Sequence, residues 1–259
     1  MSNRLPEVTL SESDGVRYLH LGTPWVQGAM RIDAPLTLEL EYVQRMMVWL
    51  LFRDERHAAR GHAVQLGLGA AALTRFCSSR LRMRTTAVEL NPQVIEACRR
   101  WFRLPPEGER LTVVAGDAAA FAADAARHAS VDALMVDLYD HEAASPVLDS
   151  AAFYADCHGL LAQGGVMTVN LFGRAASFER SIDRIAGVFG DAAVLQLRPT
   201  REGNTIAIAM KQVTPAGTDL LARRAENIET RWKLPARKWL RMIRGRARPP
   251  QPLPALPPA

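Results

Sequence analysis

The sequence has few cysteines, and no spacing that pairs them. Its three cysteines, Cys77, Cys98 and Cys157, lie far apart, which argues against a disulfide framework or a zinc cluster and predicts a reducing compartment. The six histidines are scattered, with no HExxH pattern and no Cys–His spacing, so we expect no metal site.

Long apolar segments are also absent. The longest unbroken apolar run, Met46–Phe52, is far shorter than the roughly 20 residues that a membrane-spanning helix needs. The first residues, "MSNRLPEVTLSESDG", are polar and lack the apolar core of a signal peptide. With 48% hydrophobic and 23% charged residues, ordinary values for a globular chain, these features predict a cytoplasmic protein without a transmembrane segment.

Acidic residues are missing from one C-terminal segment. Residues 231–248 carry eight Lys or Arg, and subtracting these charges from the net +5 leaves −3 for the rest of the chain. The basicity is therefore local, which weakens any interpretation of the whole protein as nucleic-acid-binding. The segment could form an amphipathic helix on an anionic surface, but a solvated extension is the favoured interpretation. The proline-rich tail after it is expected to be disordered or polyproline II.

Strands and helices alternate along most of the chain. Short strands are expected within 7–32, and apolar residues at helical spacing predict a helix over 35–52. From residue 62, near-continuous apolar strands alternate with helices, which is typical of a parallel sheet covered on both faces. The expected strands are 62–69, 84–90, 110–117, 131–140, 165–172, 192–199 and 204–211. The last two face each other across "TREG", which predicts an antiparallel pair at one sheet edge.

This pattern predicts three regions. Residues 1–34 would form a small N-terminal β-unit, and residues 35–213 a Rossmann-like α/β domain. Residues 214–259 would hold a C-terminal helix, the basic segment and the proline-rich tail. Ligands of such sheets bind at the carboxyl ends of the strands near the topological switch point, so site residues are expected there.

A glycine turn follows the first of these strands. In "QLGLGAAA", Gly67 and Gly69 permit a tight turn and let backbone N–H groups approach a ligand, with the start of a helix behind them. Glycine after a strand is often only a turn. Glu89 favours a nucleoside, because it ends the next strand 20 residues after Gly69, where a carboxylate can accept hydrogen bonds from both ribose hydroxyls.

Acidic residues end the next two strands as well. Asp117 could accept a hydrogen bond from an adenine amino group, or could simply cap the following helix. Asp137 and Asp140 end the strand expected at 131–140, where a purely structural role is harder to find. Since carboxyl ends of parallel strands meet at one edge, these acids and Glu89 are expected to form one rim.

The order of glycine turn, ribose glutamate and adenine aspartate resembles the class I S-adenosylmethionine fold, a Rossmann-like methyltransferase-type α/β sheet. Four segments resemble the spermidine/spermine synthase family, the polyamine aminopropyltransferases: "VELNPQVIEACRRWF", "VVAGDAAAF", "MVDLYD" and "FYADCHGLLAQGGVMTVN". The N-terminal "LHLGTPWVQ" and "LEYVQRMM" are similar to the family's strand ending in glutamine and its tyrosine-bearing helix. The resemblance covers residues 16 to 211.

The resemblance implies which residues bind the donor, decarboxylated S-adenosylmethionine. Gln27 would contact the donor, Glu89 its ribose, and Asp117 with Ala118 its adenine. The loop departs from the family's usual G-G-G-D-G-G, because Ala70 stands where the aspartate should be. In the family that aspartate binds the amino group of the aminopropyl arm, so weak discrimination between decarboxylated and ordinary S-adenosylmethionine is expected. Restoring the acid by Ala70→Asp would then favour the decarboxylated donor.

The resemblance also implies the residues on the acceptor side. Asp137 would be the catalytic acid/base, Asp140 would help to hold the cationic amine, and Tyr42 would line the substrate cleft. The chemistry agrees, because a polyamine ammonium has a pKa of about 10.4 and must lose a proton before its nitrogen attacks the carbon beside a sulfonium. The family's Y-[HQ]-E reads Tyr42-Val43-Gln44 here, with less negative charge for a diamine.

The leading prediction is transfer of an aminopropyl group from decarboxylated S-adenosylmethionine to a polyamine, with no metal. One alternative is a methyltransferase that uses S-adenosylmethionine on a small molecule. Another is a nucleoside-binding protein without turnover, attached to a partner through its basic segment. The resemblance further implies a homodimer formed through the N-terminal strands.

Overall fold

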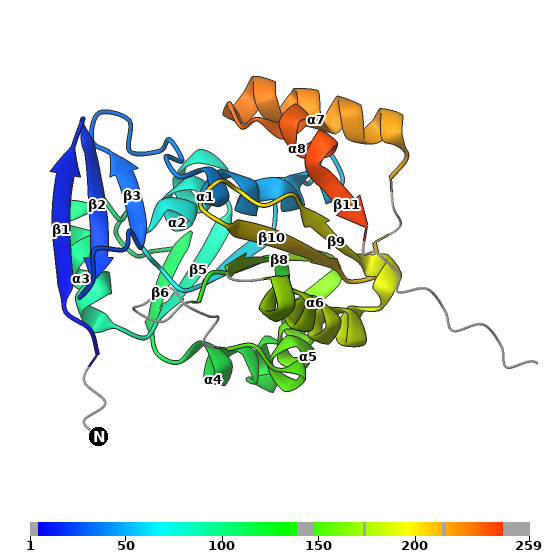
Figure 1. Cartoon of the computed structure of the whole chain (residues 1–259), viewed down its shortest axis with the longest axis horizontal. Coiled ribbons are helices and arrows are strands. Elements are labelled where there is room, and N and C mark those ends of the chain that lie inside the picture. The colour runs from blue at the N-terminus through cyan, green and yellow to red at the C-terminus, as the bar shows by residue number, and fades with distance from the viewer. Residues whose placement is uncertain (1–4, 139–147, 173–174, 214–215, 246–259) are drawn as a thin grey trace, which may run out of the picture.

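A single eight-stranded sheet forms the body of the protein, seen here in a computed structural model that describes residues 5–138, 148–172, 175–213 and 216–245 (Figure 1). The strand order is β11-β9-β10-β8-β7-β4-β5-β6. Five strands are parallel: β4 (His62–Leu66), β5 (Arg84–Glu89), β6 (Leu111–Ala115), β7 (Val131–Val136) and β8 (Leu161–Phe172). Three are antiparallel to their neighbours: β10 (Asn204–Met210), β9 (Val194–Leu197) and β11 (Ile243–Gly245). The predicted mostly parallel sheet with an antiparallel strand pair is therefore confirmed.

The N-terminal β-unit is a separate three-stranded antiparallel sheet. Its strands are β1 (Val8–Ser13), β2 (Val16–Leu21) and β3 (Gly28–Arg31). Figure 1 shows this small sheet standing beside the β6 side of the body. Leu19 and Met30, both fully buried, pack in one cluster with residues of the glycine turn and of the helix α3 (Pro92–Trp101). The unit therefore forms a wall beside the carboxyl ends of the parallel strands.

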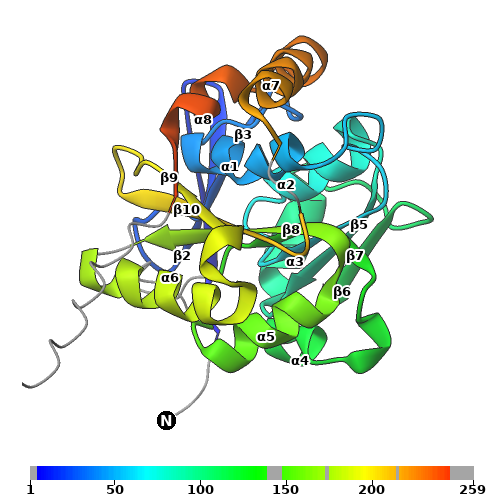
Figure 2. The ribbon, with the colours of Figure 1, turned by 90° about the vertical axis from the view of Figure 1, so that its right-hand side faces the viewer.

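Helices cover both faces of the large sheet (Figures 1 and 2). On one face lie α1 (Glu41–Met46), the 3-10 helix η1 (Met47–Phe52), α2 (Ala72–Arg75), the π-helical turn η2 (Phe76–Arg80), α7 (Thr218–Trp232) and α8 (Ala236–Met242). On the other lie α4 (Ala118–Ala122), η3 (Ala125–Arg127), α5 (Ala151–Leu160), α6 (Ala175–Phe189) and η4 (Asp191–Ala193). The helix predicted over 35–52 begins only at Glu41 and tightens after Met46, where all six side chains of η1 are buried.

Residues 231–245 of the basic segment differ from the expected solvated extension, and the proline-rich tail lies outside the described residues. Trp232, Leu234 and Trp239 are only 9%, 4% and 1% exposed, because they pack on η1 and the sheet. β11 continues the sheet beyond β9, so the predicted antiparallel pair is not the edge. The aromatic side chains that suggested a lipid-facing helix are thus core residues. Within the part of the chain that the structure describes, no helix has the length and apolarity to cross a bilayer.

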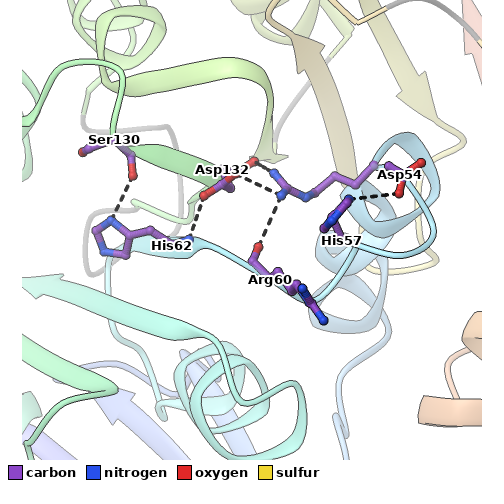
Figure 3. A network of polar contacts seen from close by, with 7 residues as sticks. Asp54, His57, Arg60, His62, Ser130 and Asp132 are labelled. Carbon is purple, nitrogen blue, oxygen red and sulfur yellow. Dashed lines mark hydrogen bonds and ion pairs between the residues drawn. The ribbon is translucent and has the colours of Figure 1, made fainter.

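A polar network joins the amino ends of β4 and β7, at the edge opposite to the carboxyl ends (Figure 3). The two oxygens of Asp132 accept hydrogen bonds from the Arg53 guanidinium at 2.9 Å and from the His62 backbone N–H at 2.8 Å. The His62 Nδ1 atom lies 3.3 Å from the Ser130 carbonyl oxygen, which can only accept, so Nδ1 carries the proton. Nε2 then accepts a hydrogen bond from the Thr86 hydroxyl at 2.8 Å.

This network makes stability depend on pH. Burial lowers the pKa of His62 from 6.5 to about 4, with the Arg84 charge as a smaller cause. As the pH falls from 6.5 towards 4, His62 binds a proton in the unfolded chain but not in the folded chain. The free energy of unfolding therefore decreases. We expect His62→Gln to flatten this decrease in denaturant unfolding at a series of pH values. Wild-type and variant curves that stay parallel would contradict this role.

Candidate active site

A cavity of about 810 Å³ opens at the carboxyl ends of the parallel strands, beside the N-terminal sheet. Eight of the nine predicted site residues line it: Gln27, Tyr42, Gly67, Gly69, Glu89, Asp117, Ala118 and Asp137. The ninth, Asp140, lies outside the described residues. The structure thus gathers side chains that are far apart in sequence, as expected when successive strands end at one edge.

The cavity has two halves, set by the strand order. The β5 half lies over β4, β5 and β6 and contains Gln27, Gly67, Gly69, Glu89, Asp117 and Ala118. The β10 half lies over β8 and β10, where α1 packs, and contains Glu39, Glu41, Tyr42, Asn170, Glu202 and Asn204. Asp137 follows β7, the strand between them.

The glycine turn brings the ends of β4 and β7 together. Gly67 has φ +89°, and a Cβ atom there would lie 2.2 Å from the carbonyl oxygen of Asp137. Only glycine combines this conformation with so close an approach. The Asp137 N–H in turn donates to the Leu66 carbonyl at 2.9 Å. The turn therefore fixes the backbone of Asp137 as well as its own.

Glu89 holds the turn from the end of β5. Its Oε2 atom accepts a hydrogen bond from the Leu68 N–H at 2.9 Å, and Oε1 accepts one from the Asn91 N–H at 2.8 Å. Burial raises the pKa of Glu89, and the backbone hydrogen bonds of Asn91 and Leu68 oppose that rise. A carboxylate oxygen can accept more than one hydrogen bond, so Glu89 can serve the turn and two ligand hydroxyls together.

Asp117 and Ala118 form the start of α4. Asp117 Oδ1 accepts hydrogen bonds from the N–H groups of Ala119 at 2.6 Å and Ala120 at 3.2 Å, so the helix-cap interpretation holds for this residue. Both Asp117 and Ala118 also line the β5 half. Capping through one oxygen and lining the cavity are compatible, because the carboxylate has a second oxygen.

The side-chain amide of Gln27 has an unsatisfied hydrogen-bond donor among the described residues. Its Nε2 atom is buried and has no hydrogen-bond partner among the residues that the structure describes, although the residue lines the β5 half. A buried donor without a partner costs about 1–3 kcal/mol. The side chain therefore has the geometry of a group that a ligand would satisfy.

Asp137 is the centre of a small polar cluster between the halves. Its Oδ1 atom accepts a hydrogen bond from Asn170 Nδ2 at 2.9 Å, and Tyr42 also bonds to the carboxylate. Burial raises the pKa of Asp137, against the lowering effect of the Asn170 and Tyr42 hydrogen bonds. A carboxylate with a raised pKa is a better proton acceptor than an exposed one.

Sequence reasoning missed Asn170 and Glu202. Asn170 is 4% exposed on β8, and its Oδ1 accepts a hydrogen bond from Asn204 Nδ2 at 3.1 Å. The signal was a lone asparagine in the apolar strand "VMTVNLF". Glu202 gave no signal, since it lies in a turn and reaches the cavity only through the β9–β10 pairing.

Comparison with known proteins decides the family. A family model described as the spermine/spermidine synthase domain matches residues 73–189. The polyamine aminopropyltransferase of Neisseria meningitidis serogroup A is 36% identical over 232 residues, covering 88% of this chain and 86% of the relative. That of Chromobacterium violaceum is 34% identical over 233 residues, covering 89% and 86%. The chain belongs to the polyamine aminopropyltransferase family.

Solved structures show the same fold at lower sequence identity. A probable spermidine synthase from Corynebacterium glutamicum superposes with a TM-score of 0.71 at 20% identity, covering 95% of both chains. The spermidine synthase of Thermotoga maritima gives 0.62 at 16% identity, covering 90% of this chain and 84% of its own. Human methyltransferase-like protein 13 in complex with SAH also gives 0.62, at 21% identity, covering 81% and 96%. The fold is thus shared with a methyltransferase-like protein.

The family pattern predicted that position 70 faces the amino group of the donor, and this prediction is wrong for Ala70. This residue is 2% exposed, packs in a cluster with Leu19 and Met30, and is not among the residues that line the cavity. A Cβ atom built on Gly28 would lie 2.6 Å from the Ala70 Cβ, so the methyl group points at the β3 backbone. Ala70→Asp would therefore bury a carboxylate against the N-terminal sheet rather than expose it to a donor.

The contact between Gly28 and Ala70 couples β3 to the glycine turn. A Cβ on Gly28 would also lie 2.5 Å from the Ala70 backbone nitrogen, so Gly28→Ala must move one of the two segments. We expect a loss of about 1–3 kcal/mol in the free energy of unfolding, with weaker nucleoside binding. The matched control is Gly187→Ala on α6, where a Cβ would meet nothing within 4 Å. Equal effects of both substitutions would contradict the coupling.

Proposed function

We propose that the protein transfers an aminopropyl group from decarboxylated S-adenosylmethionine to an amine nitrogen of a polyamine. The observation that carries this proposal is the position of Asp137, half-buried between the two halves and bonded to Asn170 and Tyr42. A donor in the β5 half and an acceptor in the β10 half would both reach this carboxylate.

The donor would be bound by the residues of the β5 half. Glu89 would accept hydrogen bonds from both ribose hydroxyls, and Asp117 with Ala118 would contact the adenine. Gln27 would satisfy its buried amide on the donor. The backbone of Gly67 and Gly69 would approach the sulfonium end, since glycine leaves this turn open to a ligand.

The reaction would need one proton acceptor and accurate positioning. The acceptor ammonium gives its proton to the Asp137 carboxylate, and the freed nitrogen lone pair attacks the aminopropyl carbon beside the sulfonium. The carbon–sulfur bond breaks with its electron pair on sulfur, which leaves neutral 5′-methylthioadenosine. Tyr42 would line the acceptor path, and Asp140 would help to hold the amine. Because the sulfonium is already activated, the protein chiefly positions the two substrates.

Binding of the two donor forms tests the proposal. Side-by-side calorimetric titrations with decarboxylated and ordinary S-adenosylmethionine should show tighter binding of the decarboxylated form. A strong preference for ordinary S-adenosylmethionine, with methylation of an acceptor, would favour a methyltransferase instead. A homodimer and a cytoplasmic location remain predictions.

A further inference from the structure

Three glutamates line the β10 half: Glu39, Glu41 and Glu202. Glu39 is held by Arg31, whose Nε and Nη2 atoms each donate to a separate carboxylate oxygen at 3.1 Å. An ammonium group that entered this half would therefore find the charge of Glu39 already balanced. Whether Glu41 and Glu202 are also paired with cations decides how many cationic groups an acceptor can place in this half.

The negative charge of Glu41 is balanced by two cationic side chains, one of which lies outside its own helix. Its Oε1 atom accepts hydrogen bonds from Arg45 Nη2 at 2.9 Å and from Lys238 Nζ at 2.7 Å. These two hydrogen bonds lower the pKa of Glu41, and that of Lys238 has the larger effect. The lysine side chain is 53% exposed, whereas that of Arg45 is 5% exposed. Lys238 is therefore the partner that a ligand or a substitution can remove.

The fold holds Lys238 in this position from the far end of the chain. Lys238 lies on α8, next to Trp239, which is 1% exposed in the core. The following strand, β11, pairs with β9, and Arg237 ties the start of α8 to Glu229 on α7. The C-terminal segment thus delivers a primary ammonium, the same chemical group as a polyamine terminus, to an acid of the cavity wall.

Glu202 is the third glutamate of the β10 half. It lies in the turn between β9 and β10, which is closed by the Thr200 N–H donating to the Asn204 carbonyl at 2.8 Å. Its side chain has no cation partner among the residues that the structure describes, and it lines the cavity with Asn204 and Phe172. Glu202 is exposed, so its carboxylate is open to a cation from solvent.

Resting on the proposed function, we propose that Glu202 binds the distal ammonium of the acceptor, while Lys238 excludes a further ammonium by occupying Glu41. The two residues would together set the number of cationic groups in the acceptor. Asp137 takes the reacting amine, Glu202 takes one more, and the Lys238 ammonium repels a third. The site would accordingly favour a diamine over a triamine.

The first test is Glu202→Gln, assayed with decarboxylated S-adenosylmethionine as donor. We expect the KM for putrescine, a diamine, to rise about five- to tenfold, because one charged contact is lost at a partly exposed site. The kcat and the dissociation constant of 5′-methylthioadenosine should stay unchanged. With butylamine, a monoamine of the same length, wild type and variant should give the same kcat/KM. An unchanged putrescine KM, or an equal loss with both amines, would overturn the role of Glu202.

The second test is Lys238→Gln, with Arg241→Gln as the matched control. Both residues are exposed on α8, but of the two only Lys238 contacts a cavity acid. We expect the ratio of kcat/KM for spermidine, a triamine, over that for putrescine to rise about fivefold in Lys238→Gln. The control should keep the wild-type ratio. An unchanged ratio in Lys238→Gln, or the same rise in the control, would overturn the role of Lys238.

Failure of the proposed function can be distinguished from failure of the roles assigned to Glu202 and Lys238. If wild type transfers an aminopropyl group to none of the three amines, the proposed function fails and this inference falls with it. If wild type does transfer and the variants behave like it, only the assignment of Glu202 and Lys238 is wrong.

Discussion

Asp137→Asn is expected to lower kcat for aminopropyl transfer by about a hundredfold to ten-thousandfold, the usual contribution of a positioned general base. The substitution keeps the shape of the side chain and an oxygen that can still accept the Asn170 hydrogen bond. It removes the carboxylate that would take the ammonium proton. The measurement is steady-state kcat with putrescine, beside the dissociation constant of 5′-methylthioadenosine, which should be nearly unchanged.

Stability separates this role from a structural one. Because burial raises the pKa of Asp137, the folded chain disfavours its charged form, so a carboxylate at pH 7 costs stability relative to the unfolded chain. Asp137→Asn should therefore unfold no more easily than wild type at pH 7. The control is Asp156→Asn on α5, an aspartate that does not line the cavity. A variant of Asp137 that fails to fold, or one that keeps full activity, would refute the assignment.

Glu89→Gln is expected to produce the second large effect, a loss of nucleoside affinity. Charge-assisted hydrogen bonds are worth about 1.5–3 kcal/mol each, so weakening two of them lowers affinity by at least about tenfold. The amide can still accept one of the bonds from Leu68 or Asn91, which limits damage to the turn. The measurement is calorimetric titration with 5′-methylthioadenosine and S-adenosylhomocysteine, two ligands that share the ribose.

The matched control for Glu89 is Glu96→Gln on α3. Glu96 pairs with Arg100 at the surface, its side chain is 57% exposed, and it does not line the cavity. We expect wild-type affinity for both ligands in this variant. If Glu89→Gln also binds both ligands as wild type does, Glu89 supports the glycine turn alone and the ribose assignment is wrong.

The sequence predicted the parts of the fold that follow from periodicity. The run "ALMV" of β7 is apolar throughout because both faces of the strand are buried, and that pattern needs no tertiary knowledge. Gly67, Glu89 and Asp137 could be found for the same reason, since polar or glycine residues directly after buried strands mark the functional edge.

The remaining features depend on contacts between distant segments. The burial of Ala70 depends on Gly28, more than 40 residues away in the N-terminal sheet, so the loop sequence alone could not give its direction. Trp239 could be a lipid-facing or a core residue by its spacing, and only the pairing of β11 with β9 decides. Lys238 and Glu41 are 197 residues apart, and no local pattern connects them.

Product analysis tests the central claim most directly. The protein is incubated with equal amounts of decarboxylated and ordinary S-adenosylmethionine and a mixture of putrescine, spermidine and butylamine, and all products are identified by mass spectrometry. Our account predicts 5′-methylthioadenosine together with an amine that has gained an aminopropyl group, and at least about a hundredfold slower formation of both with Asp137→Asn. Formation of S-adenosylhomocysteine together with a methylated amine would contradict it.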